Sequence, residues 1–110
     1  MGEAIVTPEE RYITLVEAFL QYPGVVQEGK GFGSSALKIG GKIFAMLVRG
    51  RLVVKLPRQR VDALIASGHG ERFDPGHGRI MKEWLTIDQT AESKWQALAT
   101  EAMEFVGSQR

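Results

Sequence analysis

The fold is decided by one stretch of the chain, ALKIGGKIFAMLVRGRLVVKL, residues 36–56. Two residue pairs interrupt its short apolar runs, Gly40-Gly41 and Arg49-Gly50. Each pair has the length of a two-residue hairpin loop, and glycine supplies the positive φ that such tight turns need. The stretch therefore predicts three antiparallel strands: Ala36 to Ile39, Lys42 to Val48 and Arg51 to Leu56.

Two-residue loops also fix the register, so the faces of the sheet can be assigned. One face is predicted to carry Ile43, Ala45, Leu47, Leu52, Val54 and Leu56, with Lys38 at its edge. The other is predicted to carry Leu37, Ile39, Phe44, Met46, Val48 and Val53, with Lys42, Arg51 and Lys55 at its border. A solvated antiparallel sheet alternates apolar and polar residues. Two apolar faces therefore predict that both are covered.

Helical signals flank this stretch on the N-terminal side. Thr7, Pro8 and Glu10 have the spacing of a capping box with proline at the first helical position. An apolar stripe at helical spacing follows, made of Tyr12, Leu15, Val16, Phe19 and Leu20. We expect a helix that ends at Pro23-Gly24, and then a short strand over Val25 to Glu28.

The C-terminal half predicts two more helices and one more strand. Pro57 starts a helix that Gly68 caps, residues 68–78 form a loop, and a strand runs from Arg79 to Ile87. The last helix runs from Ala91 to Val106 and buries Trp95. The order αββββαβα predicts the α+β class, an antiparallel sheet with helices packed on its Leu47–Val54 face.

Charge is divided unevenly along the chain. From Gly29 to Val61 there are eight basic residues and none of the thirteen acidic residues, although the whole chain has a net charge of +1. Such a division indicates that the basic residues form a surface that contacts an acidic partner, or one that contacts the acidic half of the chain itself. Because +1 is far from the basic character of dedicated nucleic-acid binders, we favour a solvated rim paired with the chain's own acids.

Nucleic-acid binding is the alternative interpretation of the same residues. Lysines and arginines on a sheet face could neutralise phosphates, which gives weak, non-specific and salt-dependent binding. The candidate residues are Lys38, Lys42, Arg49, Arg51, Lys55 and Arg58.

Length and composition bound the class of protein. A chain of 110 residues is expected to form a single domain over residues 1–110. The chain has no cysteine, which excludes disulfides and thiol chemistry. Its N-terminus does not have the pattern of a signal peptide, and no apolar run approaches the roughly 20 residues of a membrane span. We therefore expect a cytoplasmic protein that does not associate with membranes.

Two segments come close to known site motifs. Gly24 to Gly31 nearly matches a phosphate-binding P-loop, but Gly31 stands where a serine or threonine must hold Mg²⁺. His69, Glu71, Asp74 and His77 are potential metal ligands or bases, yet they lie in a glycine- and proline-rich stretch that also contains Arg72. A structural loop is favoured there, so no cofactor and no metal is predicted. An enzyme of unknown reaction that uses the His69–His77 loop is kept as a second alternative.

Several segments resemble the TfoX/Sxy family, N-terminal domain type. They are Gly31 to Ser35, Gly41 to Ala45, Leu52 to Pro57, Ala66 to Gly68, Phe73, Arg79 to Trp84, and a last helix with Trp95 and Ala102. The likeness extends roughly from Phe19 to Val106 in matching order. It implies a small αβ fold related to YjbR-like and secretion-chaperone-like domains. Founding members regulate bacterial competence and carry a helical C-terminal domain, which we do not expect in this chain. The family has no established catalytic residues.

These observations favour a non-enzymatic regulatory or protein-interaction module. The proposed partner surface is the second sheet face, with Phe44, Met46 and Val53 at its centre and Lys42, Arg51 and Lys55 at its rim. A polar border around an apolar centre is how interfaces are built. The occupant could be a second copy in a two-fold homodimer, another protein, or the chain's own C-terminal helix crossing to this face.

Overall fold

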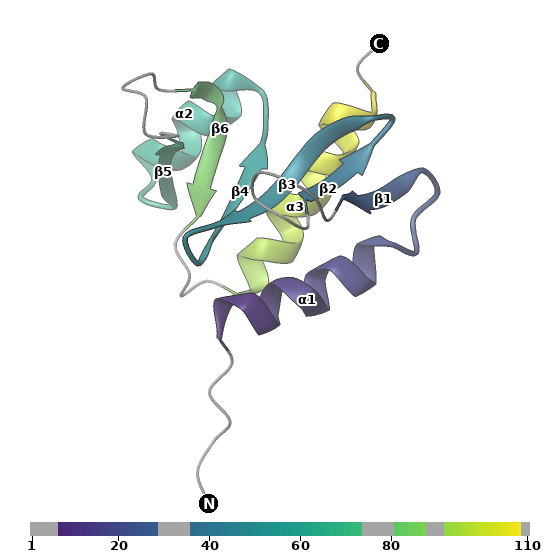
Figure 1. Ribbon diagram of the computed structural model, residues 1–110. Helices are drawn as coiled ribbons and strands as arrows, with labels where there is room; N and C mark the ends of the chain where they lie inside the picture. Colours follow the sequence, from purple (N-terminus) through teal and green to yellow (C-terminus); the bar gives the residue numbers. More distant parts are fainter. Residues whose placement is uncertain (1–6, 29–35, 74–80, 88–91, 109–110) are drawn as a thin grey trace, which may run out of the picture.

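The structure is a computed structural model that describes residues 7–28, 36–73, 81–87 and 92–108, and the statements below concern these residues. It contains a six-stranded antiparallel sheet and three helices, which confirms the predicted α+β class (Figure 1). The elements in chain order are α1 (Pro8–Phe19), β1 (Val25–Glu28), β2 (Ala36–Ile39), β3 (Lys42–Val48), β4 (Arg51–Lys55), α2 (Arg58–Ala66), β5 (Gly70–Phe73), β6 (Met81–Ile87) and α3 (Glu92–Gly107).

The strands are arranged in the order β1-β2-β3-β4-β6-β5, so β1 and β5 form the two edges. Strand β5 was not predicted, because residues 68–78 were expected to form a loop. Gly70-Glu71-Arg72-Phe73 has no apolar alternation, and the strand exists through its pairing with β6, in which Gly70 lies opposite Ile87 and Glu71 opposite Thr86. Gly70 permits this pairing, since a Cβ there would lie 2.5 Å from the backbone oxygen of Thr86.

The local signals at turns and helix ends are confirmed. Thr7 Oγ1 accepts a hydrogen bond from the Glu10 amide, and Glu10 Oε1 accepts one from the Thr7 amide. At the end of α2, the amides of Gly68 and His69 bond the carbonyls of Ile65 and Leu64, the pattern of a Schellman motif. Both predicted hairpin turns form, with Ile39 opposite Lys42 and Val48 opposite Arg51.

The predicted faces are wrong for the first hairpin because a β-bulge interrupts it. Lys38 lies opposite Ile43, but the next residue, Leu37, lies opposite Ala45, so Phe44 is an extra residue in β3. A bulge adds one residue to one strand and reverses the faces beyond it. Leu37, Ile39 and Phe44 therefore pack in the main core with Leu52, whereas Ile43 joins the opposite face. The predicted faces are confirmed for the second hairpin. One face of the sheet carries Ala45, Leu47, Leu52 and Val54, and the other carries Met46, Val48 and Val53.

One face of the sheet, here called the helix face, carries all three described helices. Helix α3 runs across β2, β3 and β4, and α2 lies against β5 and β6 (Figure 1). The main core between these layers takes Phe19 from α1, Val61 from α2 and Trp95 from α3, and Trp95 is buried as predicted.

The opposite side of the sheet, here called the second face, carries a smaller cluster. Ala36, Met46, Val53 and Phe73 are buried there, with half-buried Ile43, Val48 and Trp84 around them. The last helix does not cross to this side, because its apolar residues lie in the main core. The three residues predicted at the centre of the partner surface are buried: Phe44 is 0 % exposed on the helix face, and Met46 and Val53 are 7 % and 0 % exposed.

Candidate functional site

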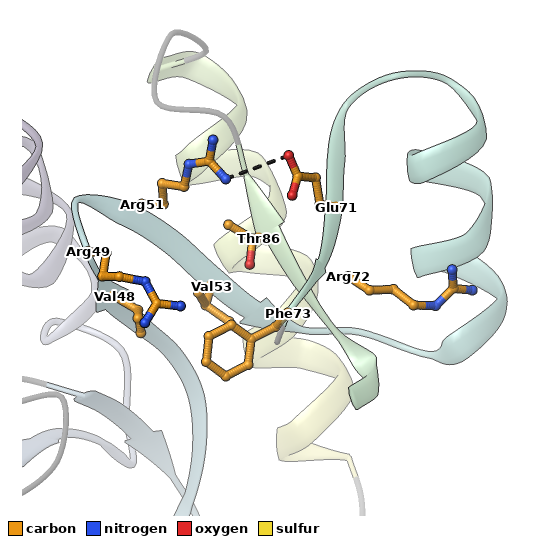
Figure 2. A pocket seen from close by; sticks show the side chains of 8 residues that line it. All are labelled: Val48, Arg49, Arg51, Val53, Glu71, Arg72, Phe73 and Thr86. Carbon is orange, nitrogen blue, oxygen red and sulfur yellow. Dashed lines mark ion pairs between the residues drawn. The ribbon is translucent and has the colours of Figure 1, made fainter. Parts of the chain in front are cut away.

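A hollow of about 210 Å³ opens on the second face, and we call it the arginine hollow (Figure 2). It lies where the β3–β4 hairpin meets β5 and β6. Its lining residues are Val48, Arg49, Arg51, Val53, Glu71, Arg72, Phe73 and Thr86.

Cross-strand pairing builds the floor of the arginine hollow. Val53 lies opposite Thr86, and Thr86 lies opposite Glu71, so these residues of β4, β6 and β5 share the second face. Val53 and Phe73 are buried, and Thr86 is the buried polar residue of the described chain, at 9 % exposure. The floor is therefore closely packed, and Val53 and Phe73 expose almost no surface to the hollow.

The rim of the arginine hollow carries charged side chains of both signs, and they differ in where they point. Arg51 Nη1 lies 3.7 Å from Glu71 Oε2, and these side chains are 42 % and 71 % exposed. Arg49 extends from the turn over the hollow, whereas Arg72 points away toward α2 (Figure 2), where it pairs with Asp62. Among the described residues, the charged side chains that face the arginine hollow are thus Arg49, Arg51 and Glu71.

Arg49 has a left-handed backbone, with φ of 52°. It occupies the first central position of a hairpin turn whose second position, Gly50, has φ of 78°. Turns with positive φ at both positions favour asparagine, aspartate or glycine, and a long side chain there costs roughly 1–2 kcal/mol. Strained residues of this kind gather at functional sites. The side chain of Arg49 is therefore a candidate for a role that the turn itself does not require.

The structure separates the residues of the predicted partner surface. Phe44 lies under the helices, and Lys42 lies exposed at a hairpin turn, opposite Ile39. Met46, Val53, Arg51 and Lys55 do belong to the second face, and Lys55 Nζ stands 5.7 Å from the ring centroid of Trp84. The sequence named Glu71 only as a potential metal ligand or base in a loop, and it did not predict that Glu71, Phe73 and Thr86 share a site, because the pairing of β5 with β6 has no local signal.

Four of the eight basic residues in the window from Gly29 to Val61 form ion pairs with acidic residues from outside it. Arg51 pairs with Glu71, Lys55 with Glu83 at 4.0 Å, Arg58 with Asp62 at 4.0 Å, and Arg60 with Glu101 at 2.9 Å. The hydrogen bond to Glu101 raises the pKa of Arg60. For these residues the interpretation that the basic stretch meets the chain's own acidic half is confirmed. Arg58 and Arg60 lie on α2 in the helix layer, apart from the arginine hollow.

The His69–His77 segment is described only in part. His69 Nδ1 is hydrogen-bonded to Lys94 Nζ at the edge of a second hollow, of about 200 Å³, between α2 and α3. Asp74 and His77 lie outside the described residues, as do Gly29 to Gly31 of the P-loop-like segment. Within the described ranges, no group of three or more His, Cys, Asp or Glu side chains could hold a metal ion.

We compared the chain with protein-family models, with curated proteins and with solved structures, and found no match. Among the described helices, none is long and apolar enough to cross a membrane.

Proposed function

We propose that this chain is a non-enzymatic interaction module of the TfoX N-terminal type that holds a protein partner at the arginine hollow. One observation carries the proposal. The hollow places Arg49 and Arg51 beside half-buried Val48 and above buried Val53 and Phe73, on the sheet face that bears no described helix. Apolar area beside arginine is the composition that protein interfaces favour.

Binding is favoured over catalysis by the chemistry of the lining. Arginine stays protonated throughout the physiological pH range, so it binds anions but does not act as a general base. Glu71 is 71 % exposed and lies beside Arg51, in an environment that does not desolvate its carboxylate. A general base tuned for catalysis usually needs such desolvation.

A protein partner is favoured over nucleic acid by the distribution of the basic residues. Nucleic-acid binding needs a track of cations that follows the phosphates. Here Arg58 and Arg60 lie on α2 and engage Asp62 and Glu101, away from the second face. The cations of the arginine hollow are a local pair beside apolar groups, which suits a protein surface.

Site-specific photo-crosslinking in cells tests the proposal. A photoreactive amino acid at Glu71, on the rim of the arginine hollow, is expected to capture a discrete protein. The same amino acid at exposed Ala63 on α2 serves as the control and is expected not to capture it. Adding Arg49→Asn to the Glu71 variant should abolish the capture, and purified components should reproduce it.

Two results would contradict the proposal. Capture that is equal from both positions, or insensitive to Arg49→Asn, would show that the hollow is not the binding surface. Tight binding of a fluorescent DNA duplex at moderate salt, lost in Arg49→Asn, would favour the nucleic-acid alternative instead. Sedimentation of the purified chain shows whether the partner is a second copy.

A further inference from the structure

We infer that the second hollow, here called the α2–α3 hollow, binds the oxyanion group of a small molecule, a carboxylate or a phosphate, through Lys94 and His69. The hollow has a volume of about 200 Å³, which lies below the roughly 300–1,000 Å³ of pockets for drug-sized ligands. It therefore suits an ionic head group. The hollow lies in the helix layer, apart from the arginine hollow, and the inference does not rest on the proposed function.

The positive charge of Lys94 is not neutralised by any carboxylate of the described residues. Its Nζ is hydrogen-bonded to Nδ1 of His69, and this is its one polar contact in the described part of the chain. An ammonium has three N–H donors and no acceptor, so two donors remain for a ligand. Lys94 is also the third residue of α3, where the helix dipole disfavours a cation. An anion beside Lys94 would offset both effects.

The same contact determines which donor His69 can offer. Because the ammonium of Lys94 only donates, Nδ1 must accept through its lone pair. The imidazole in this arrangement is therefore the neutral tautomer that carries its proton on Nε2. Half-buried His69 lines the α2–α3 hollow, and its Nε2–H adds a second donor beside Lys94.

The one carboxylate in the described lining does not compete for Lys94. Both oxygens of Glu101 accept hydrogen bonds of 2.9 Å from Arg60, so these two charges cancel and the charge of Lys94 is left over. The lining leucines, Leu64 and Leu98, are only 7 % and 4 % exposed. Binding here would therefore depend on charge and hydrogen bonds, with little apolar contact, which is the chemistry of an oxyanion site.

The test is a two-dimensional ¹H–¹⁵N NMR titration of the whole chain at neutral pH. Acetate and methyl phosphate are the two oxyanion probes, and chloride at equal ionic strength is the control. At least one oxyanion is expected to shift the amides of His69 and Lys94 and the Nε2 signal of His69, with a Kd on the order of 1–10 mM. The tighter oxyanion identifies the kind of head group. Chloride should bind at least about tenfold more weakly.

Three variants locate the binding. Lys94→Gln should weaken oxyanion binding at least about tenfold, whereas Lys94→Arg keeps the charge and should stay within about threefold of the unchanged chain. Lys42→Gln removes an equal charge from an exposed hairpin whose Ile39 lies against Gly107. That end of α3 is roughly 20 Å from Lys94, beyond the Debye length, so the affinity should change less than about twofold. The same spectra report whether each variant is folded.

Each of four other outcomes overturns the inference. Absence of saturable binding by both oxyanions would mean that the hollow is not an anion site, and equal binding of chloride would mean that no oxyanion is recognised. An equal loss in Lys42→Gln would indicate diffuse charge attraction. An imidazole spectrum that places the proton of His69 on Nδ1 would remove the contact with Lys94 on which the site depends.

Discussion

Arg60 on α2 donates two parallel hydrogen bonds, each of 2.9 Å, to the two carboxylate oxygens of Glu101 on α3. The two residues are 41 positions apart in the chain. The pair joins the basic window to the acidic C-terminal helix, and its geometry is the bidentate arrangement that suits a guanidinium and a carboxylate. It lies at the edge of the hollow between α2 and α3.

The Arg60–Glu101 pair should contribute modestly to stability. Both side chains are partly exposed, so solvent screens them, and we expect a coupling free energy of about 0.5–1 kcal/mol. A double-mutant cycle with Arg60→Gln and Glu101→Gln, read by urea unfolding, measures it. The coupling should shrink at high salt. A coupling near zero at low salt would show that the bidentate pair does not form in solution.

Phe44→Ala should destabilise the fold strongly. Phe44 is 0 % exposed and packs with Phe19 in the main core, so the truncation should cost about 3–5 kcal/mol of unfolding free energy. The control is Ile13→Ala on α1, which is 56 % exposed and should change stability by no more than about 0.5 kcal/mol. A small effect at Phe44 would mean that the bulge does not place it under the helices.

Gly70→Ala should disturb the β5–β6 edge. The new Cβ would lie 2.5 Å from the backbone oxygen of Thr86, so the strands must move apart, at a cost of about 1–3 kcal/mol. Hydrogen exchange of the β5 and β6 amides should accelerate. Glu71→Ala, an exposed change in the same strand, should leave stability within about 0.5 kcal/mol. Equal effects of the two changes would argue against close strand contact at Gly70.

Tyr12 should make stability fall at alkaline pH. Burial raises the pKa of its phenol above the usual value, so the unfolded chain releases this proton at about pH 10 while the folded chain retains it. The stabilising contribution is therefore complete below about pH 10, and declines by up to about 1.4 kcal/mol per pH unit as pH rises toward the folded pKa. Urea unfolding at several pH values above 9, with Tyr12→Phe as comparison, measures this slope. A slope unchanged in Tyr12→Phe would show that another group causes it.

Local features of this protein could be predicted from the sequence because a few neighbouring residues determine them. The capping box at Thr7 and Glu10 needs only residues three apart, and the hairpin turns at Gly40-Gly41 and Arg49-Gly50 need only two residues of suitable φ. The helical spacing around Trp95 correctly predicted its burial. The α+β class follows from the order of such elements.

Features that depend on a second strand were decided only by the tertiary structure. The bulge at Phe44 arises from its pairing with β2, and it reversed the faces predicted for Leu37, Ile39 and Ile43. Strand β5 exists through contacts with β6, which the composition of Gly70 to Phe73 does not reveal. The arginine hollow needs both strands, because Arg49 comes from one hairpin while Glu71 and Thr86 come from strands paired later in the chain. Hydrogen bonds and packing between distant segments leave no periodic pattern of residues in the sequence. The face on which a residue lies, and the residues that line the hollow, are therefore fixed only when the sheet is assembled.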